Sequence, residues 1–182
     1  MAIQRDGEGQ RALLAGDRDA ARAEFAAAAE LYRQSWEVAP PTAYGRLVGM
    51  LKSAALAGSG APQAEYVLAE LPDADPQSAT ASYARALAAL ILGHDEDARA
   101  WALRMNAGGE AFARTSEALA ALAEHDAARF EAALAEIVGD FEQRTEHLTG
   151  VAIADTALML EVLAARRGMA VAIESPVLPA LQ

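Results

Sequence analysis

The chain contains no cysteine, and this absence excludes disulfide bridges, thiolate metal sites and cysteine nucleophiles. Lysine is nearly absent too, since Lys52 is the only lysine among 15 lysines and arginines. Aromatic residues make up only 5% of the chain, so its interior must be built largely from small side chains. Segment 1–10 lacks the apolar core of a secretory leader. We therefore expect a protein of a reducing, cytoplasmic environment.

The sequence also lacks a long apolar run and a basic stripe. Its best apolar stretch, residues 150–165, is interrupted by Asp155 and Glu161, which argues against a membrane span. The net charge is −11 and the pI is about 4.7. Nucleic-acid binding requires cationic side chains that displace counterions, so this balance argues against it. An acidic surface instead favours a basic protein partner.

What the sequence has in abundance is alanine, the strongest helix former, with 48 copies. Alternating β-branched runs are missing, apart from a short stretch at 169–173. These features predict an all-α protein of about nine helices in antiparallel hairpins, forming one domain over residues 1–182. We expect repeat hairpins over 9–138, capping helices over 139–168 and an extended tail over 169–182.

Capping residues predict where several of these helices begin and end. The first helix is expected over residues 9–15, followed by Asp17 as the cap of the next one. Asp75 is predicted to cap a later helix by accepting a bond from its first amides, and another helix is expected to start after Asp126. Gly168 is predicted to stop the last helix.

An aromatic, a small residue and an arginine recur in a fixed order. The three copies are Tyr44-Gly45-Arg46, Tyr83-Ala84-Arg85 and Phe112-Ala113-Arg114. Recurrence at roughly 30–40 residues is typical of stacked helix pairs.

If the pairs stack in order, Arg46, Arg85 and Arg114 occupy equivalent places on successive first helices. Such a ridge would bind a carboxylate-bearing peptide, and Tyr44 and Tyr83 would add contact area. The alternative is that each arginine pairs with acidic residues of a neighbouring helix, while the aromatics pack inside.

The spacing of small and aromatic residues resembles that of tetratricopeptide repeats. The matching positions are Gly9, Gly16, Ala21, Phe25 and Ala28, and again Gly93, Ala98 and Ala102. The resemblance covers residues 9–138, without the repeat's early tryptophan. It implies a right-handed array whose first helices line a concave binding face.

The C-terminal third resembles the close of the immunity protein 49 family, an all-helical group thought to neutralise bacterial toxins. Residues 160–168 end a helix in Arg-Arg-Gly, and residues 173–179 carry Glu-Ser and Leu-Pro, as that family does. This resemblance implies a toxin as the partner. The chain is shorter than members of that group, and Val177 replaces an expected aromatic residue.

A second candidate site surrounds His147. A helix over 140–147 would place Arg144 and His147 on one face, and Asp155 follows on the next helix. A buried aspartate needs a partner, which Arg144 or His147 would supply. The three residues form either a structural polar cluster or a site for a ligand or for acid–base chemistry.

Other signatures of catalysis are missing from the sequence. His94 and His125 stand alone in predicted turns, so no metal and no cofactor is expected. Phosphate-binding glycine loops and nucleophile elbows are also missing. We therefore expect a protein- or peptide-binding module without catalytic activity, with a homodimer possible. An immunity protein that binds a basic toxin is one alternative, and a small-molecule site or enzyme near His147 is another.

Overall fold

The computed structural model describes residues 1–71 and 78–179. Within these ranges the chain forms α-helices and one short 3-10 helix, and no β-strand, which confirms the all-α prediction. The elements in chain order are α1 (Ala2–Leu14), α2 (Arg18–Glu37), α3 (Gly45–Leu56), α4 (Ala61–Glu70), α5 (Ala79–Leu92), α6 (Asp95–Arg104), η1 (Met105–Gly108), α7 (Glu110–Ala123), α8 (Ala127–Glu142) and α9 (Asp155–Arg166).

Local signals set several of these ends as predicted. The Asp17 carboxylate accepts a bond from the Ala20 amide at 3.0 Å and so caps α2. Asp126 caps α8 in the same way, through the Arg129 amide at 3.1 Å. Gly168 adopts a left-handed φ of +68° just after α9, a conformation that favours glycine.

Two of the predicted boundaries need comment. The first helix begins at Ala2 instead of residue 9, because i,i+3 and i,i+4 contacts from Glu8 to Arg5 and Gln4 support its first turns. The cap predicted at Asp75 lies outside the described residues.

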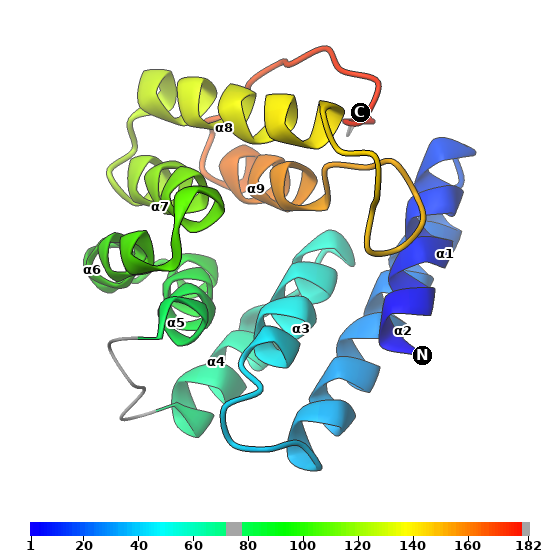
Figure 1. Ribbon diagram of the computed structural model, residues 1–182, viewed down its shortest axis with the longest axis horizontal. Helices are drawn as coiled ribbons and strands as arrows, with labels where there is room; N and C mark the ends of the chain where they lie inside the picture. The colour runs from blue at the N-terminus through cyan, green and yellow to red at the C-terminus, as the bar shows by residue number, and fades with distance from the viewer. Residues whose placement is uncertain (72–77, 180–182) are drawn as a thin grey trace.

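Successive helices pack on one another around a curved path (Figure 1). Helix α2 packs between α1 and α3, α5 packs between α4 and α6, and α7 packs between α6 and α8. The helices α3, α5 and α7 also contact one another in that order. The extended backbone of residues 169–174 then runs to a turn that pairs Ser175 with Leu178.

Helix α9 lies on the inner side of this curve, where it contacts α3, α7 and α8 (Figure 1). Packing on α8 is what a cap would do, but contact with α3 returns the chain to a helix about 100 residues earlier. Helix α9 therefore lies against α8 and also on the inside of the curve.

Two arginines fix the C-terminal end of α9. Arg166 donates to the carbonyl oxygens of Ala55 and Ser59, at 3.3 and 3.2 Å. Arg167 donates to the Leu90 carbonyl and to Asp95, the latter at 3.1 Å. The Ala55 and Leu90 carbonyls already accept the Gly58 and Gly93 amides, so the arginines add a second donor and tie α9 to the C-terminal ends of α3 and α5. The other end of α9 is thereby held at the centre of the molecule.

Small residues let the helices approach closely. An added Cβ at Gly9 would stand 2.9 Å from the Phe25 ring, and one at Gly49 would stand 2.8 Å from the Tyr32 ring. The buried apolar side chains from α2 to the tail form one continuous cluster, rich in alanine and leucine. None of the described helices combines the length and the hydrophobicity that a membrane-spanning segment needs.

Candidate functional site

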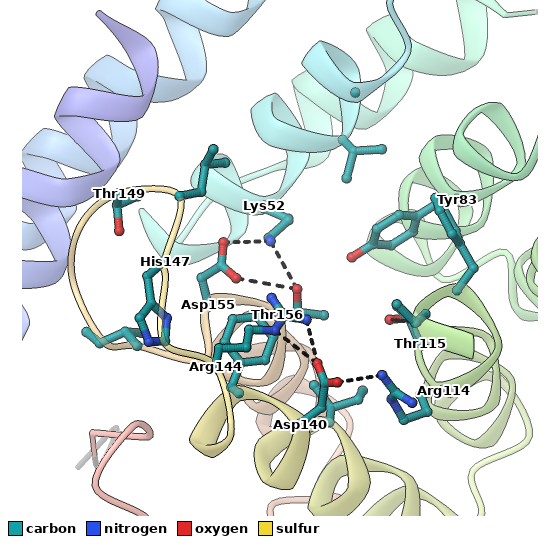
Figure 2. Close-up of a pocket in the computed structure, with 18 of the residues that line it drawn as sticks. Lys52, Tyr83, Arg114, Thr115, Asp140, Arg144, His147, Thr149, Asp155 and Thr156 are labelled. Carbon is teal, nitrogen blue, oxygen red and sulfur yellow. Dashed lines mark hydrogen bonds and ion pairs between the residues drawn. The ribbon is translucent and has the colours of Figure 1, made fainter. Parts of the chain in front are cut away.

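A cavity of about 340 Å³ lies where the inner ends of several helices meet (Figure 2). Its walls come from α3, α5, α7, α8, the start of α9 and the loop 143–154, with Gln10 from α1. The volume is at the lower end of the range for small-ligand pockets. The polar and aromatic residues on its walls are Gln10, Lys52, Thr80, Tyr83, Phe112, Arg114, Thr115, Asp140, Phe141, Arg144, His147, Thr149, Asp155 and Thr156.

One wall carries two arginines that share a single carboxylate. The Oδ1 atom of Asp140 lies 2.7 Å from Nη2 of Arg114, and its Oδ2 atom lies 2.5 Å from Nη2 of Arg144. Glu110 also approaches Arg114, at 3.9 Å, but its side chain is almost fully exposed and is screened by water. This wall therefore has one positive charge in excess.

Aromatic stacking fixes the position of the second arginine. The Arg144 guanidinium lies 3.8 Å from the centroid of the Phe141 ring. The His147 ring stacks on Phe141 as well, with the centroids 6.3 Å apart. Cation–π contact and stacking hold both groups at the cavity wall without a further ion pair.

The opposite wall carries an ion pair between α3 and α9. The Lys52 ammonium lies 2.7 Å from the Asp155 carboxylate and donates to Thr156 at 3.1 Å. Burial lowers the pKa of Lys52, but Asp155, with smaller contributions from Tyr83 and Asp6, outweighs it and leaves the pKa above its ordinary value. Lys52 therefore stays charged at neutral pH.

Two buried polar atoms on the cavity walls have no hydrogen-bond partner among the described residues. They are the Tyr83 hydroxyl, which the Thr156 side chain approaches without forming a hydrogen bond of normal geometry, and Nδ1 of His147. Tyr83 is only 9% exposed, and its hydroxyl points toward the middle of the cavity (Figure 2). Burial raises the pKa of Tyr83, so the hydroxyl keeps its proton and can donate it in a hydrogen bond. Unsatisfied buried polar atoms are uncommon and point to a missing partner.

The loop 143–154 closes the cavity and is anchored on α1. The Thr149 hydroxyl donates to Oε1 of Gln10. Gly7 permits this approach, because a Cβ there would lie 3.1 Å from the Thr149 carbonyl oxygen. Leu148 is 79% exposed on the same loop and lines the cavity, so it stands at the mouth.

A smaller cavity of about 140 Å³ adjoins the first one. The two share Gln10, Lys52, Leu148, Thr149 and Asp155 among their lining residues.

The smaller cavity reaches inward to Asp6, which accepts hydrogen bonds from Tyr32 at 2.9 Å and from Ser53 at 2.7 Å. Burial raises the pKa of Asp6, against the effect of these two bonds. The charge on Asp6 is therefore only partly compensated.

The residues of the predicted arginine ridge have different surroundings. Arg114 and Tyr83 line the cavity, but Arg46, Arg85 and Tyr44 do not. Arg46 donates to the Ser35 carbonyl, and Tyr44 stacks on Trp36 with centroids 6.1 Å apart.

Arg85 donates to the Leu71 carbonyl and lies 4.4 Å from the centroid of the Trp101 ring. Arg114 pairs with Asp140 of the neighbouring helix α8, as the alternative interpretation of the three arginines expected.

The residues of the predicted polar cluster all reach the cavity, with different partners. Arg144, His147 and Asp155 line it together. The partner expected for Asp155 was wrong, because Lys52 fills that place and Arg144 turns to Asp140. Helix α8 also ends at Glu142, so Arg144 and His147 stand on a loop instead of a helix.

The sequence pattern does not single out Lys52 or Asp6 as site residues, and it places Asp140 only among the acidic residues near His147. Asp140 and Asp6 stand among many acidic residues and give no signal of their own. Lys52 does give one, since it is the only lysine in a chain that otherwise uses arginine. Its partner Asp155 is 103 residues away, a separation that no local pattern reveals.

Metal ligation is not suggested by the described residues, where no group of three or more His, Asp or Glu side chains could hold an ion. His125 is 3.0 Å from Asp95 at a turn. Comparison with known proteins identified no match to any family model, to any curated protein or to any solved structure.

Proposed function

We propose that the protein is a non-catalytic binding module whose ligand, a small molecule or the end of a peptide, enters the central cavity. The observation that carries this proposal is the combination of an excess positive charge beside Asp140 with a buried, unpartnered Tyr83 hydroxyl. A ligand that brings an acceptor to this wall would satisfy both.

The position of α9 favours a compact ligand over a long peptide. The inner side of the curve, where an extended peptide would lie along α3, α5 and α7, already holds α9. The central cavity lies at the N-terminal end of α9 and is open to a ligand. Binding of a peptide by a ridge of Arg46, Arg85 and Arg114 stays a prediction. Such a peptide would have to contact Arg46 and Arg85 outside the cavity, because only Arg114 lines it.

The pairing of the charged groups favours binding over catalysis. Asp155 is paired with Lys52, and Asp140 is paired with two arginines. The His147 ring stacks on Phe141, and the described residues offer no carboxylate bonded to it. A general base needs an orienting partner or a free carboxylate, and a binding site does not.

A blocking substitution tests the proposal. Ala111 lines the cavity and is exposed, so Ala111→Trp would fill the mouth with little strain. We expect ligands found by NMR screening of a library of small acids, amines and short peptides to lose binding in this variant. Ala128→Trp, an exposed position on α8 away from the cavity, is the control and should bind as the original chain does.

Two results would contradict the proposal. One is a library in which nothing binds the original chain. The other is binding that Ala111→Trp leaves unchanged, because the ligand would then occupy another surface.

The acidic balance favours a second candidate, the neutralisation of a basic toxin by direct binding. The net charge is −11, and the most exposed side chains in ion pairs include those of Asp19 and Glu110. Such a surface attracts a cationic partner over distance. Co-expression with a toxin encoded beside this gene should rescue growth, and a gene neighbourhood without a toxin would argue against this candidate.

A further inference from the structure

The two adjoining cavities carry opposite charges. In the larger one, Arg114 and Arg144 share Asp140, and the only other carboxylate near them among the described residues is the solvent-screened Glu110, which leaves one positive charge in excess on the cavity wall. In the smaller one, Asp6 and Asp155 face only Lys52, which leaves one negative charge in excess. The Lys52–Asp155 pair belongs to both linings and is itself neutral.

Asp6 and Arg114 are partly buried, whereas Arg144 is more exposed, and neither excess charge is fully compensated by the chain. Asp6 receives hydrogen bonds from two hydroxyl groups but no ion pair among the described residues. Arg114 and Arg144 divide one carboxylate between them, beside the unpartnered Tyr83 hydroxyl. Removing a charge from water is costly unless an opposite charge accompanies it. A ligand with one charge of each sign would supply both.

On this basis we infer that the double cavity binds a small zwitterion, with its carboxylate beside Arg114 and Arg144 and its ammonium group beside Asp6. This inference rests on the proposed function and adds the class of ligand. The Lys52–Asp155 pair lines both cavities, and each excess charge belongs to one cavity alone, so we expect the ammonium and carboxylate groups to be several bonds apart. An ω-amino acid has this form, and so does a short peptide with free ends.

Matched probes separate the contributions of the two charges. The zwitterions are 4-aminobutyrate, 6-aminohexanoate and trialanine, measured with the full chain by isothermal titration calorimetry. The comparison compounds for 6-aminohexanoate are hexanoate and hexylamine, and 4-aminobutyrate is compared with butyrate and butylamine. The comparison compounds for trialanine are N-acetyl-trialanine, which lacks the ammonium group, and trialanine amide, which lacks the carboxylate. Each comparison compound keeps the chain of the zwitterion and lacks one of its two charges.

We expect at least one zwitterion to bind about ten-fold or more tightly than both of its singly charged analogues, since a hydrogen bond to a charged group contributes on this scale. Preference for 6-aminohexanoate or 4-aminobutyrate identifies a free amino acid as the ligand. Preference for trialanine identifies the two ends of a short peptide.

Substitutions then assign each charge to its wall. Asp6→Asn keeps the shape of the side chain and can still bond to Tyr32 and Ser53. It should reduce the affinity of the preferred zwitterion to that of its carboxylate-only analogue, while the affinity for that analogue stays the same. Arg114→Met should weaken the carboxylate-only analogue. Asp19→Asn, a fully exposed position on α2, is the matched control and should change neither.

The comparison of probes on the original chain needs no variant, so the test holds even if Asp6→Asn unfolds. Zwitterions that bind no more tightly than their singly charged analogues would overturn the inference. An ammonium contribution that persists in a folded Asp6→Asn protein would overturn it as well. If hexanoate or butyrate still bound and Ala111→Trp blocked it, the proposed function would stand without the zwitterion. If none of the probes bound, the inference would fail, and the library screen alone would decide the proposed function.

Discussion

At the scale of single residues, burial without a charged partner is the main source of pH dependence. Glu161 on α9 is half-buried, and burial raises its pKa to about 7. Between its ordinary pKa and pH 7, the folded state holds a proton that the unfolded state releases. The free energy of unfolding therefore falls as pH rises through this range.

Glu161→Gln should remove this pH dependence. The variant and the original chain should have similar stability at pH 4.5, where the glutamate is protonated in the folded state. At pH 8 the variant should be more stable by about 1 kcal/mol, a value reduced to allow for the partial exposure of the side chain. Urea unfolding across this pH range measures the difference.

The matched control for this prediction is Glu131→Gln, an exposed position on α8. It should change the stability little at any pH. A difference between Glu161→Gln and the original chain that does not grow with pH would show that the Glu161 carboxyl is not desolvated in solution.

At the scale of elements, α9 is held by two neighbouring arginines in different surroundings. The Arg167 side chain is 11% exposed and bonds to Leu90 and Asp95, whereas Arg166 is more exposed. Arg167→Met should cost about 2 kcal/mol, because it removes two hydrogen bonds of a charged donor, to Asp95 and to the Leu90 carbonyl, from a mostly buried position. Arg166→Met should cost less than about 1 kcal/mol. Urea unfolding at pH 7 compares them, and equal losses would contradict this account.

The elements themselves were largely predictable from local sequence, and their packing was not. Asp17, Asp126 and Gly168 act through bonds within a few residues of themselves, so the pattern reveals them. The start of α1 was not marked in this way, because it depends on weak contacts between polar side chains. The place of α9 depends on Lys52–Asp155 and on the Arg166 and Arg167 bonds, which join residues 72 to 111 positions apart.

The same distinction explains the candidate site. Arg144, His147 and Asp155 lie within 12 positions of one another, and the sequence analysis grouped them on that ground alone. The other charged groups of the two cavities come from distant segments, with Asp6 on α1, Lys52 on α3, Arg114 on α7 and Asp140 on α8. The pairing of Lys52 with Asp155 depends on the return of α9 to α3, a tertiary contact that has no signature in either segment.

At the scale of the whole molecule, the return of α9 should make the curved row of helices unfold as one unit. A row in which each pair contacts only its neighbours can open in parts. Here α9 joins α3 to α7 and α8, and the loop 143–154 joins α8 and α9 to α1. Opening either end therefore breaks contacts with the other.

The two tryptophans are placed to test this. Trp36 ends α2 and bonds to Glu70, and Trp101 lies on α6 beside Arg85 and Arg104. The Trp101→Phe variant keeps Trp36, so its fluorescence reports on the surroundings of α2. The Trp36→Phe variant keeps Trp101, so its fluorescence reports on the surroundings of α6. In each variant we expect the thermal transition seen by fluorescence to coincide with that seen by far-UV circular dichroism. Separate transitions would mean that α9 does not couple the two ends, and a stable cavity between them would then lose its physical basis.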